Sequence, residues 1–521
     1  MNRKTILTNV VMVMFCIFQY LSVSGQTDQP NIIFILADDL SYRDLSCYGQ
    51  KRYQTPNLDG LARSGIRFTQ AYAAAPECAP SRAALLTGLH TGRGRIRTNS
   101  SARGQEHLHD EDLTIAEVLK EAGYNTGFTG KWGVGLPGTE GLPYKQGFDY
   151  CFGYYDQSRA HTFIPDYLWE NDTKVFYPEN KGFEMNRRYD YSQVQNTYDE
   201  EGKLYIEELE EPYKYAYSQN EIEVASLQFI DEHHPQKTGA PFFLYFATQL
   251  PHGPVITDRM EGLSCPDTVS QTSCEWGAMV VQLDEYVGQL MAYLKDNNLY
   301  DNTILFFASD NGYSMCGYTL RGNGPDWPDD PWLQNKGPFT GGKFSVLEGG
   351  CRVPFFVSCP AKYKPAVYSD PVWLPDFFPT AISLAGLEAN AYDHDGKSLL
   401  PFMEGQSGKF KAHEYLYFSK GAEQAVRMGP WKAYRKNYNA PMELYLIEED
   451  TYTQQNLAHL YPNVVKKVED IMEKEHKPTK WYRNPKESQQ EYQAKKLRAI
   501  AEGEVLPKFR PNGIKRFPWE K

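Results

Sequence analysis

The chain has 521 residues, of which 41% are hydrophobic, 14% aromatic and 23% charged. This composition supplies a large buried core and excludes a disordered, fibrous or disulfide-framework protein. Lys and Arg number 54 against 66 Asp and Glu, and the net charge of −12 argues against nucleic acid as a partner and against non-specific adhesion to anionic membranes.

Residues 1–25 are typical of an export signal. Basic residues come first, an apolar run from Ile6 to about Val23 follows, and small residues end the segment. The apolar run is short for a bilayer span, so we expect cleavage near Gln26, with no stable membrane span afterwards and a periplasmic or secreted protein. An uncleaved membrane anchor is the alternative.

Short apolar runs that end in polar residues alternate with segments of helical periodicity over residues 26–390. The alternation predicts an α/β domain with a large, mostly parallel sheet sandwiched by helices. The strands are predicted at 31–37, 125–131, 241–247, 303–309 and 353–358, and the helices between them at 114–121, 218–232 and 276–297.

The pattern changes after a predicted helix at 374–386. Short strands joined by Gly and Pro turns and one later helix predict a smaller C-terminal α+β subdomain over residues 391–521, with an antiparallel sheet and a terminal arm. The strands are predicted at 415–419, 424–428, 431–434 and 443–446, and the helix at 463–474.

Eight cysteines remain after the predicted signal, too few for a disulfide scaffold of this size. Cys265 and Cys274 flank a short polar loop and are the favoured disulfide pair. We expect the other cysteines to be buried thiols, with Cys78 as the exception.

Cys78 begins the segment Cys78-Ala79-Pro80-Ser81-Arg82, in which Pro and Ser are good helix starters. Cys78 is therefore predicted just before a helix N-terminus, where backbone N–H groups and the helix dipole favour an anion. Arg82 adds a positive charge one turn later. The simpler interpretation is an ordinary thiol at a helix start.

This segment, followed by Leu86-Thr87-Gly88, resembles the maturation motif of the type I sulfatases of the alkaline phosphatase superfamily. The resemblance implies that a formylglycine-generating maturation enzyme oxidises Cys78, and that the hydrated aldehyde is the nucleophile. Further landmarks of that family occur in order: Asp38-Asp39, Gly130-Lys131-Trp132, Pro251-His252, Ser309-Asp310-Asn311-Gly312, and Lys343 before Glu348-Gly349-Gly350-Cys351-Arg352-Val353-Pro354.

Several of these landmarks offer oxygen ligands, which suit a hard cation such as Ca²⁺ and not zinc. The resemblance therefore implies one Ca²⁺ per chain that polarises a bound sulfate. Capping of a helix or turn is the alternative for the two adjacent aspartates. The expected metal site consists of Asp38, Asp39, Asp310 and Asn311 together with residue Cys78.

Four basic residues are expected to surround the sulfate: Arg82, Lys131, His252 and Lys343. They would concentrate positive charge on a group that carries the negative charge of the substrate. We expect His252 and Lys343 near the leaving oxygen, as acid and charge stabiliser. The alternative for each lysine is a solvated surface side chain.

One position departs from the family pattern. Where the family usually has His two residues after the motif lysine, this chain has Gly133. That histidine usually serves as the base of the second half-reaction. His161 is our candidate substitute, and a structural or sugar-contacting histidine is the alternative.

Together these features predict a sulfatase that hydrolyses a small-molecule or oligosaccharide sulfate ester. Analogy within the family favours sulfated galactose or N-acetylgalactosamine. One alternative is a phosphatase or phosphonate monoester hydrolase of the same superfamily. Another is a catalytically silent sugar-binding homologue, which the loss of the histidine at Gly133 makes conceivable.

Overall fold

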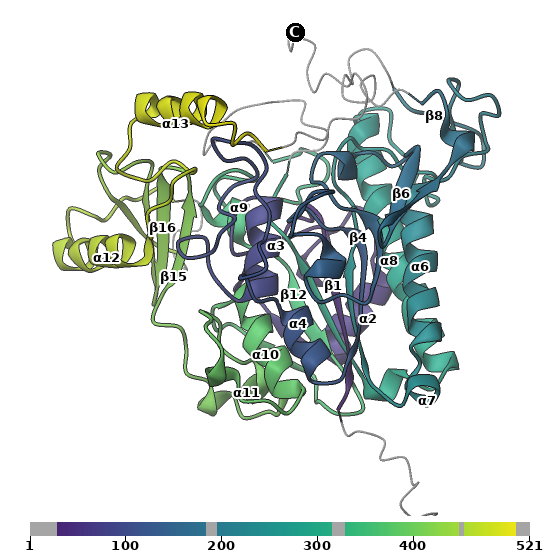
Figure 1. Cartoon of the computed structure of the whole chain (residues 1–521), viewed down its shortest axis with the longest axis horizontal. Helices are drawn as coiled ribbons and strands as arrows, with labels where there is room; N and C mark the ends of the chain where they lie inside the picture. Colours follow the sequence, from purple (N-terminus) through teal and green to yellow (C-terminus); the bar gives the residue numbers. More distant parts are fainter. Residues whose placement is uncertain (1–28, 184–194, 315–328, 448–452, 507–521) are drawn as a thin grey trace, which may run out of the picture.

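The computed structural model describes residues 29–183, 195–314, 329–447 and 453–506 (Figure 1). The predicted export signal lies outside the described residues, as does the end of the predicted terminal arm. Within the described part of the chain, no helix is both long and apolar enough to cross a bilayer.

A ten-stranded sheet runs through the larger part of the molecule in the order β13-β2-β12-β11-β1-β10-β4-β5-β6-β7 (Figure 1). β11, β1, β10, β4 and β5 are parallel, which confirms the mostly parallel sheet, whereas β12 is antiparallel to both of its neighbours. The strands are β1 (Asn31–Ala37), β2 (Ile66–Phe68), β4 (Asn125–Lys131), β5 (Tyr150–Tyr154), β6 (Tyr167–Glu170), β7 (Thr173–Phe176), β10 (Phe242–Ala247), β11 (Thr303–Ser309), β12 (Phe355–Ser358) and β13 (Ala366–Tyr368).

Helices cover both faces of this sheet, because its central strands are apolar on both sides. In β1, Ile33 and Ile35 join one core, while Ile32, Phe34 and Leu36 join the other. The first core packs against α2 (Pro56–Ser64), α6 (Ser218–Glu232) and α8 (Gln271–Asp296), and the second against α3 (Cys78–Thr87), α4 (Ile115–Glu121), α10 (Phe377–Leu384) and α11 (Leu400–Met403).

Shorter elements complete the larger part. A disulfide joins Cys265 to Cys274, which confirms the favoured pair, and the other described cysteines are free and buried or half-buried. The remaining elements are the two-stranded sheets β3 (Ala71–Tyr72) with β14 (Val372–Trp373) and β8 (Thr197–Tyr198) with β9 (Leu204–Tyr205), and the one-turn helices α7 (Pro235–Thr238) and α9 (Glu348–Cys351).

The C-terminal strands form a separate four-stranded antiparallel sheet, as predicted. Its elements are β15 (Leu416–Lys420), β16 (Glu423–Met428), β17 (Trp431–Arg435) and β18 (Glu443–Leu446), followed by α12 (Pro462–Glu475) and α13 (Gln489–Ala501). α13 lies where the sequence suggested only an arm. A capping box between Ser488 and Glu491 begins this helix, and that Ser-x-x-Glu signal is readable in the sequence.

A cluster of buried charges joins the small sheet to the larger part, and we call it the joint cluster: Tyr72, Glu348, Arg352, Arg427 and Lys432. Glu348 Oε2 accepts hydrogen bonds from Arg352 Nη2 at 2.6 Å and from Tyr72 OH at 3.0 Å. Lys432 of β17 places its Nζ 3.2 Å from Glu348 Oε1. Although burial alone would raise it, Arg352 and Lys432 lower the pKa of Glu348 to about 2.

Candidate active site

The predicted site residues meet at the carboxyl edge of the parallel strands. Because β1 pairs in register with β11, from Asn31 with Thr303 to Ala37 with Ser309, the residues that follow these two strands emerge side by side. Asp310 N donates to Ala37 O at 3.0 Å, and Asp39 N donates to Asp310 Oδ1 at 3.2 Å.

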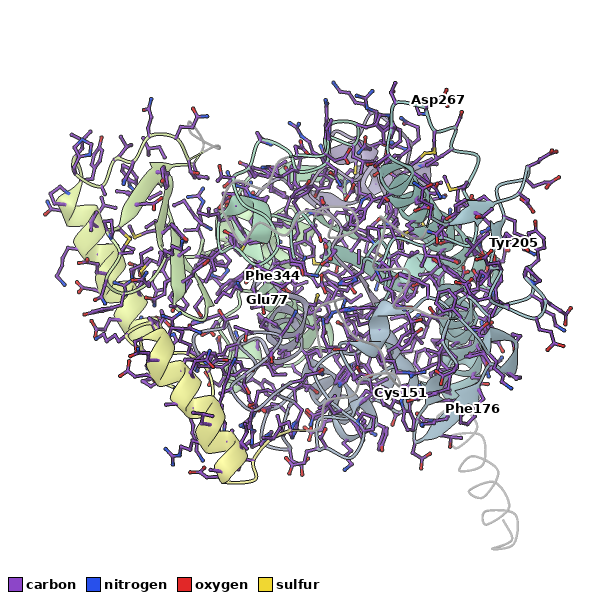
Figure 2. The ribbon with its side chains drawn as sticks, turned by 90° about the horizontal axis from the view of Figure 1, so that it is seen from above. Glu77, Cys151, Phe176, Tyr205, Asp267 and Phe344 are labelled. Carbon is purple, nitrogen blue, oxygen red and sulfur yellow. A yellow bond between two sulfur atoms is a disulfide. The ribbon has the colours of Figure 1, made fainter. Side chains whose placement is uncertain are left out.

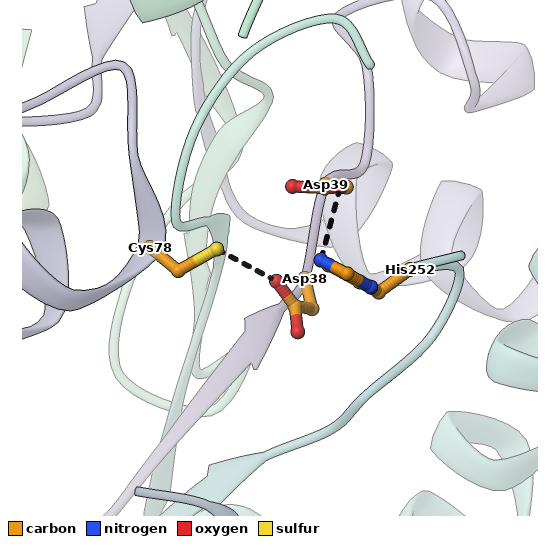
Figure 3. A group of neighbouring side chains, drawn as sticks. All are labelled: Asp38, Asp39, Cys78 and His252. Atoms are coloured by element: carbon orange, nitrogen blue, oxygen red, sulfur yellow. Dashed lines mark hydrogen bonds and ion pairs between the residues drawn. The ribbon is translucent and has the colours of Figure 1, made fainter. Parts of the chain in front are cut away.

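Four of these residues bring ligand atoms within 4.8 Å of one another: Asp38, Asp39, Cys78 and His252. Figure 3 shows Cys78 pointing at Asp38 and His252 at Asp39. The Cys78 Sγ lies 3.5 Å from Asp38 Oδ1, and His252 Nε2 lies 3.5 Å from Asp39 Oδ2. All four side chains are buried.

Each carboxylate at this edge is paired with one of the predicted basic residues. Lys131 Nζ lies 2.6 Å from Asp38 Oδ2, Lys343 Nζ lies 2.6 Å from Asp39 Oδ1, and Arg82 Nε donates to Asp310 Oδ2 at 2.9 Å. We call these six residues the site cluster. None is more than 2% exposed, so the lysines are not solvated surface side chains. Their formal charges balance, three against three.

Burial acts unevenly on the acids of the site cluster. It raises the pKa of Asp310 to about 6, with the charge of Asp38 adding to the effect. Asp39 shows the opposite result: burial opposes ionisation, but Lys343 and His252 hold the pKa of Asp39 well below its usual value. Asp310 is therefore the carboxyl of the site whose negative charge its neighbours compensate least.

Cys78 is the first residue of α3, one position later in the helix than predicted, with Glu77 as the N-cap. Figure 2, a view from above, labels Glu77 near Phe344, and Lys420 of the small sheet approaches both residues. Burial, together with Asp310, raises the pKa of the Cys78 thiol to about 12. An unmodified thiol here stays protonated and is a poor nucleophile.

The donor set fits a hard divalent cation. Asp38, Asp39 and Asp310 supply carboxylate oxygens, and the buried Asn311 Oδ1 accepts no hydrogen bond from any described residue. Asn311 Nδ2 donates to Asp39 Oδ1 at 2.8 Å, which leaves the carbonyl oxygen of the same amide as the ligand atom. A cation at this position would also compensate the like charges that raise the pKa of Asp310.

His252 and His161 lie together. Their rings stack with centroids 4.1 Å apart and an interplanar angle of 15°. His252 Nδ1 bonds the carbonyl oxygen of Gly253, which requires the proton on Nδ1, so the neutral ring accepts at Nε2 from Lys343 Nζ at 3.1 Å. Burial and the Lys343 ammonium hold the pKa of His252 well below its usual value.

Gly133 faces a residue that the sequence analysis did not identify. Its φ is +77°, and a Cβ built there would lie 2.5 Å from Gln157 Oε1 and 3.6 Å from Arg82 Cδ. Backbone bonds from Trp132 N to Tyr154 O and from Gly133 N to Tyr155 O bring the two segments together. No spacing rule links positions 133 and 157, because the contact arises from the pairing of β4 with β5.

Comparisons with known proteins identify the family and the fold. The profile of the family described as Sulfatase matches residues 30–387. The chain is 33% identical over 425 residues to the N-acetylgalactosamine-6-sulfatase of Canis lupus familiaris, covering 80% of this chain and 73% of that protein. It is 30% identical over 510 residues to the N-acetylgalactosamine-6-O-sulfatase of Bacteroides thetaiotaomicron, covering 86% and 94%. The crystal structure of Ps i-CgsB in complex with k-i-k-neocarrahexaose superposes with a TM-score of 0.67 at 28% identity, covering 91% and 98%.

Proposed function

This chain belongs to the sulfatase family and is a sulfuric ester hydrolase, and we propose that it removes sulfate from a carbohydrate by means of formylglycine at position 78 and one Ca²⁺. The observation that carries this proposal is the site cluster, in which three carboxylates and three cations surround a buried Cys78. That arrangement holds a metal cation and an anionic ester at the same place.

The modification of Cys78 explains how a buried, protonated thiol becomes useful. A maturation enzyme that recognises Pro80 and Arg82 is the proposed partner, and it acts before folding buries α3. Formylglycine supplies a hydroxyl nucleophile toward sulfur, and Ca²⁺ held by Asp38, Asp39, Asp310 and Asn311 supplies charge neutralisation.

The residues of the chain then bind and orient the ester. Arg82 and Lys131 lie on the Cys78 side, since Arg82 Nη1 donates to Lys131 O at 2.5 Å and Lys131 pairs with Asp38. His252 and Lys343 lie on the Asp39 side, where they act on the leaving oxygen as acid and charge stabiliser; because the neutral His252 ring accepts at Nε2 from Lys343 Nζ, it acts as the acid after taking up that proton. The ester is thus held between basic groups on both sides of the Asp38-Asp39 pair.

The base of the second half-reaction stays a prediction. We assign it to His161, which stacks on His252 at the site and belongs to the same buried segment as Gln157. The alternative role of His161 is a hydrogen bond to the sugar. Its ring stacks on His252, which we assign to the leaving oxygen, and that oxygen belongs to the sugar.

The proposed substrate is a sulfated galactose or N-acetylgalactosamine. The names of two relatives that share about 30% identity with this chain support N-acetylgalactosamine. The proposed location is the periplasm or the outside of the cell, after removal of residues 1–25. A panel of singly sulfated monosaccharides tests the substrate, with N-acetylgalactosamine 6-sulfate expected to show the highest kcat/KM. Faster turnover of phosphate or phosphonate monoesters would favour the phosphatase alternative, and binding of sugar sulfates without turnover would favour a silent homologue.

A further inference from the structure

The segment 155–163, which we call the Gln157 loop, follows β5 and lies between β5 and β6; it reaches the site at two points. Gln157 faces Gly133 at one point, and His161 stacks on His252 at the other. The loop is held firmly: Asp156 Oδ1 accepts from Arg159 N at 2.7 Å, and Gln249 Nε2 donates to Ala160 O at 2.6 Å. These hydrogen bonds fix the backbone that carries Gln157 and His161.

The Gln157 side chain has no hydrogen-bond partner among the described residues, at either Oε1 or Nε2, although only 5% of the residue is exposed. Burying an unpaired amide costs free energy that an apolar side chain would avoid. The neighbouring backbone is adapted to it, because any side chain at position 133 would need a left-handed φ of +77° and would collide with the carboxamide. A buried donor and acceptor kept unpaired in a catalytic site indicate a ligand.

The position of the carboxamide identifies the part of the ligand that it meets. The Gln157 carboxamide and Arg82 meet at Gly133: a Cβ built there would lie 2.5 Å from Gln157 Oε1 and 3.6 Å from Arg82 Cδ. The Arg82 guanidinium is bound to Asp310 and to the carbonyl oxygen of Lys131. His252 and Lys343 hold the leaving oxygen in the proposed function, whereas Arg82 and Lys131 lie on the Cys78 side of the site. The group expected there is the sulfo group, whose oxygens accept hydrogen bonds from a neutral N–H donor.

We propose that Gln157 contacts the sulfo group of the substrate, donating from Nε2 to one of its oxygens beside Arg82. This inference rests on the proposed sulfatase function and adds a contact residue to it. An amide does not accept or release a proton at physiological pH, so Gln157 binds and orients the sulfo group and leaves proton transfer to other residues.

Removing the donor tests this proposal. Gln157→Met keeps the length and packing of the side chain and lacks the N–H. We expect it to lower kcat/KM roughly 100-fold for both a small aryl sulfate and N-acetylgalactosamine 6-sulfate, the size of loss seen when one preorganised donor is removed. The exposed Gln228, on α6, provides the matched control, and Gln228→Met should leave kcat/KM unchanged.

Binding of inorganic sulfate gives a readout that needs no turnover. In a Cys78→Ala background, Gln157→Met should weaken sulfate binding measured by calorimetry, and Gln157→Glu should weaken it further through charge repulsion. Unchanged sulfate binding, or a loss confined to the sugar sulfate, would overturn the proposal and make Gln157 a structural or sugar-contacting residue. A wild-type enzyme inactive on every sulfate ester would instead contradict the proposed function, and the binding comparison would still decide the role of Gln157.

Discussion

The protein buries two charged clusters that differ in how their carboxylates are compensated by nearby positive charge. In the joint cluster a single carboxylate, Glu348, is surrounded by Arg352, Lys432 and the Tyr72 hydroxyl, and its pKa falls to about 2. In the site cluster three carboxylates crowd together, and burial with the neighbouring Asp38 raises the pKa of Asp310 to about 6 despite the contact with Arg82. The negative charge of Glu348 is compensated by its neighbours, whereas that of Asp310 is not.

This difference separates a structural contact from a binding site. The joint cluster fixes β16 and β17 on the larger part of the molecule, and its single carboxylate is compensated by basic side chains of the chain itself. The site cluster keeps like charges close, with Asn311 Oδ1 and the Gln157 carboxamide lacking partners among the residues the structure describes. Such an arrangement costs stability in the free protein and is stabilised by a cation and an anionic substrate. Variants of the two clusters should therefore affect different properties.

The largest expected effect on activity is that of Cys78→Ala. Turnover of every sulfate ester should fall to background, because the nucleophile at position 78 is lost. Thermal stability should change little, since the polar contact that the Cys78 thiol makes among the described residues is a long one, with Asp38. Sulfate release measures the loss of activity, and thermal melting measures the stability. Residual turnover would show that another residue attacks the ester.

Asp310→Asn should lower kcat/KM roughly 1,000-fold, equivalent to about 4 kcal/mol, because the cation loses a charged ligand. In the wild type, added Ca²⁺ should raise the melting temperature, and in Asp310→Asn this increase should disappear. Elemental analysis completes the test. Zinc in active protein, or active protein without metal, would contradict the oxygen-ligand assignment.

His161→Ala should mainly slow the second half-reaction. With an aryl sulfate we expect a burst of released alcohol followed by turnover roughly 100-fold slower, as for loss of a general base. His252→Ala should slow the burst itself, because the leaving oxygen loses its proton donor. The alternative outcome is that His161→Ala leaves the steady-state rate with the aryl sulfate unchanged and raises KM for sugar sulfates. That outcome would make His161 a specificity determinant.

Glu348→Gln should have the smallest effect on kcat and a large effect on stability. The pKa of Glu348 falls from 4.5 to about 2 on folding, which corresponds to about 3 kcal/mol of stability at neutral pH. Because the folded pKa is lowered, this contribution is present above pH 4.5 and is lost as pH falls toward 2. Denaturant unfolding at pH 7 and at pH 3 measures it; equal stability of wild type and variant at pH 7 would remove the contrast between the clusters.

The sequence predicted those parts of the molecule that depend on local patterns. Apolar runs ending in Asp38-Asp39 and Asp310-Asn311 placed the acids at one edge, because parallel strands deliver their ends to the same side of a sheet. The contact of Gly133 with Gln157 and the joint cluster around Glu348 were not predictable in this way. Both join segments far apart in the chain, and their geometry depends on strand pairing and domain packing.

The central claim is that the site cluster acts through a modified residue at position 78. Mass spectrometry of the peptide that contains residue 78 tests this claim most directly. Protein should be prepared with and without the maturation enzyme, and the fraction of residue 78 present as formylglycine compared with the rate of sulfate release. We expect the rate to rise in proportion to that fraction and to be absent where Cys78 remains a thiol. Fully active native enzyme with an unmodified Cys78 would contradict the account.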